Sequence, residues 1–161
     1  MSMMEARKLL ESLIQKHPEL GLHGYGNARH CHRPYRPQDL NSKEWQWERD
    51  ALLKDLYLEQ FFTCCRFLRK LDQTPTVEPA ALSTASLASY VFRWSREKVA
   101  VGPLIAAAHG MGFQVERVPG SNHARFNYDA QSLERLCPLG GGSDFASRIQ
   151  AGLKAATAAA S

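Results

Sequence analysis

The chain has 161 residues, of which 44% are hydrophobic and 22% charged, a composition typical of a globular domain with a buried core. Its formal net charge of +4 and isoelectric point near 9.0 favour polyanionic partners without establishing one. No apolar run reaches the roughly 18–20 residues of a membrane span, and the first residues do not have the pattern of a signal peptide. We therefore expect a cytoplasmic protein that does not contact membranes.

The N-terminal half, residues 1–72, is predicted to be helical, with a basic loop over residues 21–40. Residues 2–17 read as an amphipathic helix, because Leu9, Leu10, Leu13 and Ile14 recur at helical spacing and Pro18 follows. A long helix is predicted over residues 41–71, where Asn41 and Glu44 have the spacing of a capping box. We expect it to be the central element of the fold, with its apolar side chains largely buried. Those side chains include Trp45, Leu52, Leu56, Phe62, Leu68 and Leu71.

Prolines and threonines over residues 73–79 indicate a linker, which we extend to residue 82. Residues 83–128 then follow the order helix, turn, helix, hairpin. Ser83 can begin a helix that extends to about Glu97, and Gly102 with Pro103 opens a second helix that Gly110 and Gly112 close. Two strands are expected over residues 113–118 and 123–128. This is the order of a winged-helix module, whose second helix often enters the DNA major groove.

The expected fold is mainly α with one β-hairpin (α+β), with a winged-helix-like C-terminal half. Residues 129–161 are expected to form C-terminal helices, the first capped by Asp129 and the last beginning at Ser143.

A resemblance accompanies this organisation over residues 83–127. The residues that carry it are Ser89-Tyr90, Gly102 with Leu104-Ile105-Ala106-Ala107-Ala108, Gly112-Phe113 and Asn122-His123-Ala124-Arg125-Phe126. The pattern resembles that of uncharacterised small accessory proteins of bacterial phages, plasmids and integrated elements. The resemblance implies a mobile-element accessory protein, a class in which small regulators and inhibitors of host defence are both common. It implies no catalytic residue.

Two groups of basic residues are the candidate binding sites. In the C-terminal half the cations outnumber Glu97 and Glu116, and such side chains suit phosphate contacts. They are Arg93, Arg96, Lys98, Arg117 and Arg125. The expected second helix has only His109 as a polar side chain, which predicts burial rather than base reading. The alternative for this unit is a helix–hairpin core with no nucleic-acid role, or one that serves a protein partner.

The second group lies in the basic loop, where arginines, histidines and tyrosines alternate without an acid between residues 23 and 37. Such a loop suits stacking on unpaired bases, clamping of phosphates or anchoring of a protein interface. Alternatively, it is a solvated loop whose aromatic rings pack on the long helix. Its candidate binding residues are Arg29, His30, His32, Arg33, Tyr35 and Arg36.

The cysteines predict neither a disulfide framework nor a metal centre. Cys64 and Cys65 are adjacent, and with Cys31, Cys137 and the nearby histidines they lack the paired spacing of a zinc site. No catalytic motif selects a nucleophile, and the glycines before Ser143 lack the lysine of a phosphate-binding loop. We therefore expect reduced thiols, no metal, no cofactor and no enzymatic activity.

The function that the sequence favours is that of a mobile-element binding protein. It would contact nucleic acid through basic side chains with weak sequence specificity. The alternative is a phage- or plasmid-encoded interaction protein that inhibits a host defence complex. The identity of the partner and the oligomeric state do not follow from the sequence.

Overall fold

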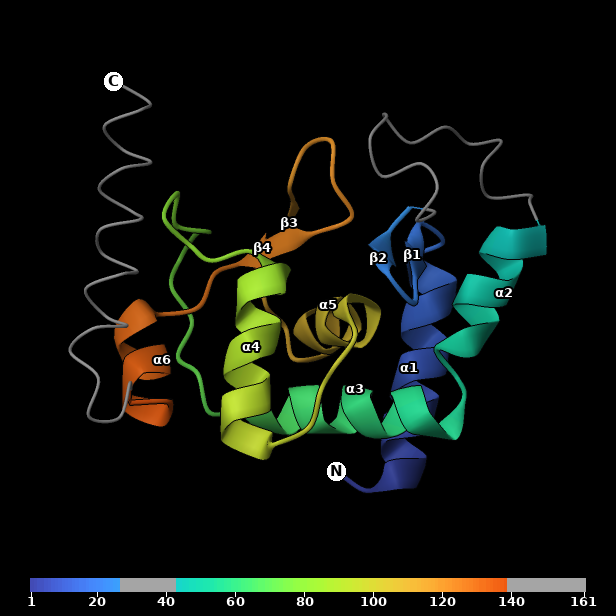
Figure 1. Cartoon of the computed structure of the whole chain (residues 1–161), viewed down its shortest axis with the longest axis horizontal. Helices are drawn as coiled ribbons and strands as arrows, with labels where there is room; N and C mark the ends of the chain where they lie inside the picture. The colour runs from blue at the N-terminus through green and yellow to red at the C-terminus, as the bar shows by residue number, and fades with distance from the viewer. Residues whose placement is uncertain (27–42, 139–161) are drawn as a thin grey trace.

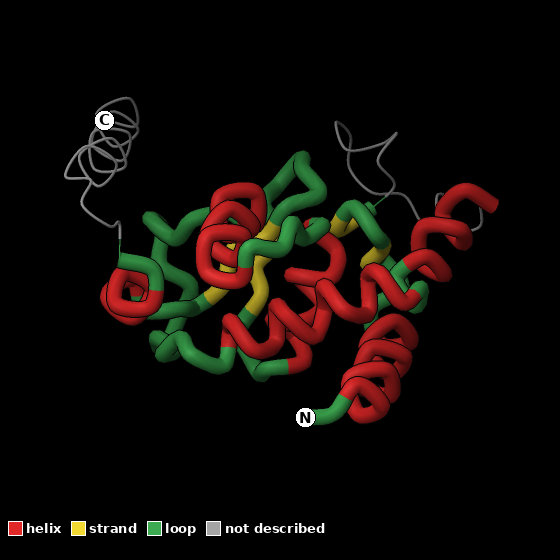
Figure 2. The backbone as a smooth tube through the Cα atoms, turned by 60° about the horizontal axis from the view of Figure 1, so that its bottom comes forward, coloured by secondary structure: helices red, strands yellow, loops and turns green. Residues whose placement is uncertain are grey.

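The computed structural model describes residues 1–26 and 43–138. These residues form six helices and two small antiparallel hairpins, in the arrangement of Figure 1. Figure 2 shows that the strands are short stretches lying between the helices. The α+β class expected from the sequence is therefore confirmed, with one more hairpin among the described residues than was predicted. The predicted helix beginning at Ser143 lies outside the described residues.

Helix α1 (Met3–Lys16) forms where the sequence predicts it. A capping box begins the helix, because Glu5 N donates to Ser2 Oγ at 3.2 Å and Ser2 N donates to the Glu5 carboxylate at 2.6 Å. The buried stripe that faces the core consists of Ala6, Leu10, Leu13 and Ile14.

The single long helix predicted over residues 41–71 is wrong, because two helices occupy this segment. Helix α2 (Lys43–Ala51) and helix α3 (Asp55–Leu68) are separated by a turn. The helical register restarts at Asp55, so Leu56 is 59% exposed and Phe61 is fully buried. Trp45, Leu52 and Leu68 are buried as expected, whereas Phe62 is only partly buried. The expected start at Asn41 lies outside the described residues.

Helix α5 (Val101–Gly110) forms the centre of the fold. Its residues 102–108 are all buried, and it packs against α1, α3 and α4 (Thr84–Ser95). One hydrophobic cluster extends across residues from both sides of the predicted linker. The N-terminal and C-terminal halves of the sequence therefore share a core in the described part of the chain.

The hairpin of β1 (Leu20–Gly21) and β2 (Gly24–Tyr25) lies in a segment that was predicted to be irregular. Backbone hydrogen bonds fix it on three sides. Leu22 N donates to Glu48 O of α2 at 3.2 Å, and Gly102 N of α5 donates to Leu22 O at 2.9 Å. Tyr25 N donates to Asn122 O at 3.0 Å, which joins this hairpin to the second one.

The second hairpin, β3 (Val115–Arg117) with β4 (Ala124–Phe126), confirms the predicted pair of strands in shorter form. The segment predicted as a linker is attached to its end, where Thr74 N donates to Asn127 O at 2.7 Å. Asn127 Nδ2 returns a bond to Thr74 O, also at 2.7 Å.

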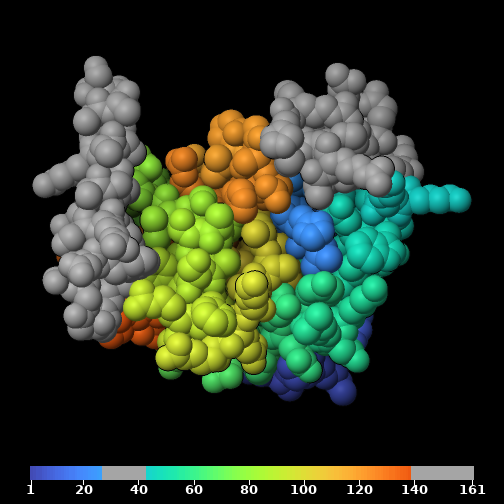
Figure 3. All heavy atoms as spheres, viewed as in Figure 1, coloured from blue at the N-terminus to red at the C-terminus, as the bar shows by residue number. Residues whose placement is uncertain are grey.

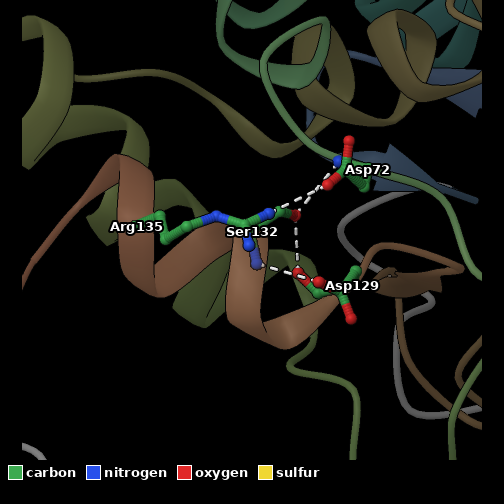
Figure 4. A network of polar contacts seen from close by, with 4 residues as sticks. All are labelled: Asp72, Asp129, Ser132 and Arg135. Carbon is green, nitrogen blue, oxygen red and sulfur yellow. Dashed lines mark hydrogen bonds and ion pairs between the residues drawn. The ribbon is translucent and has the colours of Figure 1, made fainter.

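Helix α6 (Ala130–Leu136) is capped by Asp129 as predicted, since the Asp129 carboxylate accepts from Ser132 N at 3.0 Å. A polar network, shown in Figure 4, ties α6 to the segment after α3. Asp72 N donates to Ser132 Oγ at 3.0 Å, and Arg135 forms an ion pair with the Asp72 carboxylate at 3.0 Å. The position of α6 is therefore fixed by contacts distant in sequence.

Candidate nucleic-acid interface

The predicted cations fall into three sets once the fold is known. The candidate residues of the basic loop, Arg29, His30, His32, Arg33, Tyr35 and Arg36, lie outside the described residues. The other five predicted cations are described, and they lie at opposite ends of α4. Thr84, the first residue of α4, accepts at Oγ1 from Ala124 N of β4 at 3.2 Å. Arg93 lies nine residues further along the helix, which corresponds to about 14 Å along its axis.

The first group surrounds the C-terminal end of α4, where Arg93, Arg96 and Lys98 are all exposed. Helix α3 contributes a further cation that the sequence analysis missed. The Arg66 guanidinium lies 5.7 Å from the centre of the Trp94 ring, a cation–π geometry. The edge-on contact of Trp94 with Phe67, at 5.7 Å between ring centres, joins the two helices.

Glu97 is the acid that lies among these cations in the sequence, and its carboxylate is engaged. Thr63 Oγ1 of α3 donates to Glu97 Oε2 at 2.7 Å. Residues 79–96 contain no aspartate or glutamate at all. Arg66, Arg93, Arg96 and Lys98 therefore outnumber the single carboxylate of Glu97 at this end of α4.

Arg96 has an unusual backbone conformation. It follows α4 with φ of 65°, the left-handed region, and is the one non-glycine residue with positive φ in the described part of the chain. Glycine is preferred at such a position because a side chain costs roughly 1–2 kcal/mol there. Its N–H donates to Phe92 O at 2.7 Å and so closes the helix. The strained backbone at Arg96 therefore places a charged side chain directly at the end of α4.

Two open hollows flank the end of α4. One has a volume of about 430 Å³ and is lined by Arg93, Trp94, Arg96, Leu136, Cys137 and Pro138. The other has a volume of about 420 Å³ and is lined by Ala88, Ser89, Phe92, Arg93, Lys98 and Val99. Cations and aromatic rings therefore line concave surfaces at this end of the helix.

The second group, on the β3–β4 hairpin, is engaged in contacts within the fold. The Arg117 guanidinium lies 5.6 Å from the centre of the Tyr25 ring, and its Nε donates to Ser121 O at 3.3 Å. Arg125 stands opposite Glu116 in the strand register, so an acid accompanies it across the hairpin. Both arginines are partly buried. The hairpin cations are therefore less accessible to a polyanion than those of α4.

Helix α5 is the element that the sequence order compares with a recognition helix. Its residues from Gly102 to Ala108 are buried, in agreement with the burial that the apolar sequence predicts. It cannot enter a DNA groove while the core is intact.

A partly buried polar cluster that the sequence analysis missed lies where α1, β2 and α5 meet. Tyr25 Oη and His109 Nε2 are hydrogen-bonded at 2.6 Å, and the His17 ring stacks on His109 with 3.8 Å between ring centres. His17 Nδ1 lies 3.7 Å from the Glu19 carboxylate. Burial, reinforced by the neighbouring His17, lowers the pKa of His109 to about 4, and burial raises the pKa of the Tyr25 hydroxyl. The solitary polar residue of an apolar helix was the signal that could have indicated this cluster.

This cluster should make folding stability depend on pH. Because the pKa of His109 is depressed in the folded protein, the unfolded state binds more protons between about pH 6.5 and about pH 4. Stability is therefore greatest above this window and falls as the pH falls through it. We expect a loss of about 1–2 kcal/mol, discounted because the ring is only partly buried. Urea unfolding at several pH values measures this loss of folding stability.

The matched variants for this measurement are His109→Gln and His23→Gln, since His23 is exposed. The first substitution should flatten the pH dependence between about pH 6.5 and about pH 4, and the second should leave it unchanged. An equal pH dependence in the wild type and in His109→Gln would contradict the assignment.

The described thiols are poor candidates for chemistry. Cys64, Cys65 and Cys137 are free and buried, and burial raises the pKa of each. A protonated thiol is neither a good nucleophile nor a metal ligand. Among residues 1–26 and 43–138, no three histidine, cysteine or acidic side chains gather as a metal site. Cys31 lies outside these ranges.

Comparisons with protein-family models, with characterised proteins and with solved structures find no match to this chain. No helix in the described ranges combines the length and the apolar character that crossing a membrane requires.

Proposed function

We propose that this protein is a non-enzymatic binding protein that contacts nucleic acid through basic side chains, with weak sequence specificity. The observation that carries the proposal is the group of exposed cations at the ends of α3 and α4. Arg66, Arg96 and Lys98 are exposed, and the Glu97 carboxylate beside them is hydrogen-bonded to Thr63. Exposed cations of this kind bind phosphates irrespective of base sequence.

Weak specificity follows from the placement of α5. The order α4, α5, β3, β4 supports a winged-helix-like unit. However, its second helix, α5, is buried in the hydrophobic core. No base-reading side chain can come from the buried part of that helix. The proposed protein therefore recognises the charge of the nucleic acid more than its sequence, as suits a small cytoplasmic accessory protein of a mobile element.

A titration of labelled random duplex and single-stranded DNA at several salt concentrations tests the proposal. We expect binding at low salt that weakens steeply as salt is added. The variant Arg66→Gln/Arg96→Gln/Lys98→Gln should lower the affinity for all sequences alike. It should also reduce the salt slope by roughly two to three phosphate equivalents.

The matched control removes three exposed cations elsewhere, in Lys8→Gln/Lys16→Gln/Lys43→Gln. Its net charge changes equally, so a similar loss in both variants would show that only the overall charge matters. Absence of any binding by the wild type at low salt would contradict the proposed function.

A second candidate is an interaction protein that inhibits a host complex, and one surface favours it. The ion pair of Arg7 with Asp55, at 3.0 Å, places the N-terminal ends of α1 and α3 side by side. Met4 and Leu56 are 71% and 59% exposed there, although apolar side chains of this size are normally buried. Tight capture of a purified protein partner, with no binding to DNA at low salt, would establish this candidate instead.

A further inference from the structure

The outer face of α4 is free of acidic residues along its whole length. Ser86, Ser89, Phe92 and Arg93 are exposed at helical spacing, while Leu87, Tyr90 and Val91 face the core. Figure 3 shows α4 and the segment after it on the front face of the molecule. A polyanion can therefore follow this helix without meeting a carboxylate of α4.

Phe92 is the large apolar side chain of α4 that the fold leaves in solvent. It is 43% exposed and lines the hollow of about 420 Å³ together with Ala88 and Val99. Ser89 and Ala88 are small, so the space beside the ring is open. Arg93 and Lys98 form other parts of the same wall. An exposed aromatic ring thus shares the lining of a hollow with two cations.

The chemistry of this hollow fits an unpaired base better than a peptide. A docked amphipathic helix uses several apolar anchors at helical spacing, and Phe92 offers a single large one on this face. Stacking of one base requires only one ring, and the adjoining phosphates require cations. In a duplex the base faces are already stacked on each other, so an exposed ring gains nothing from them.

We infer that the hollow between α4 and residues 98–99 binds single-stranded nucleic acid, with a base stacked on Phe92 and phosphates beside Arg93 and Lys98. This inference rests on the proposed function and names the class of its ligand. Base stacking tolerates any sequence, because every base presents a π-face, and it therefore agrees with weak specificity.

The test is a fluorescence anisotropy titration of labelled oligothymidylate and of a random duplex. Phe92→Ala should weaken oligothymidylate binding by about 5- to 150-fold, the range that loss of one stacked base produces. The salt slope should not change, because no cation is removed. Phe92→Tyr keeps the ring and should bind like the wild type. Leu56→Ala, which removes another exposed apolar side chain, is the matched control and should also bind like the wild type.

The outcomes separate this inference from the proposed function. Unchanged oligothymidylate affinity in Phe92→Ala, with the wild type binding both probes, would overturn the stacking site and leave the proposed function standing. No binding of either probe by the wild type at low salt would overturn both. Binding of an acidic peptide with one tryptophan, abolished by Phe92→Ala and unaccompanied by oligothymidylate binding, would assign the hollow to a protein partner and overturn the inference. Thermal melting verifies that each variant is folded.

Discussion

Replacing Gly102 with alanine should destabilise the protein by at least about 3 kcal/mol, a large share of the stability of a typical small domain. A Cβ atom at this position would lie 2.1 Å from Gly21 O and 2.5 Å from Leu22 O. Both are backbone atoms of the β1–β2 hairpin, which is held by hydrogen bonds to α2, α5 and Asn122. The added methyl group cannot be accommodated by a side-chain movement, so α5 or the hairpin must shift. Urea unfolding of wild type and variant measures the loss.

Gly110→Ala is the matched control, because it adds the same atom to the same helix. There the new Cβ would lie 3.1 Å from Leu9 Cδ2 and 3.2 Å from Leu13 Cδ1, the ends of flexible side chains. Alanine also favours the helix by about 1 kcal/mol over glycine. We therefore expect a change within about 1 kcal/mol. Equal effects of the two substitutions would show that α5 does not depend on the close approach of the hairpin.

Helices whose ends are marked by proline, glycine or capping residues could be predicted from the sequence. Pro18 after a regular apolar stripe, Gly102-Pro103 at a helix start and Asp129 at a cap all lie where the structure has the corresponding boundary. The burial of α5 also follows from its composition, since residues 101–108 are apolar throughout. Signals of this kind act within a few residues and do not require knowledge of the fold.

The break between α2 and α3 could not be predicted in this way, because no glycine or proline marks it. Leu52, Leu53 and Lys54 each donate a backbone bond three residues back, a tight turn that ends α2. Tertiary contacts hold α2 in place instead: Trp45 Nε1 donates to Pro18 O at 3.2 Å, and Glu48 O accepts from Leu22 N. These partners lie more than 25 residues away, which hydrophobic periodicity does not reveal.

The sequence could predict most of the cations that belong to the candidate site. It could not predict which of them the fold leaves exposed to a ligand. Sequence alone identified Arg96 and Arg117 as equivalent cations, whereas the fold exposes the first and places the second over the Tyr25 ring. Arg66 joins the group only because α3 meets α4 at Trp94. The Tyr25–His109 hydrogen bond links residues 84 positions apart, a distance at which no motif operates.

The register of α3 reverses the sequence-based expectation that Leu56 is a buried residue whose loss destabilises the fold. The structure assigns that role to Phe61 instead. Phe61 is fully buried, and Phe61→Ala should cost about 3–5 kcal/mol through lost burial and the cavity left behind. Leu56 is 59% exposed, so Leu56→Ala should change stability by no more than about 0.5 kcal/mol, since alanine and leucine are both strong helix formers. Paired urea unfolding curves decide between a broken and a continuous helix. A costly Leu56→Ala together with a neutral Phe61→Ala would mean that the helix continues unbroken from α2 and that its buried face is the one predicted from the sequence.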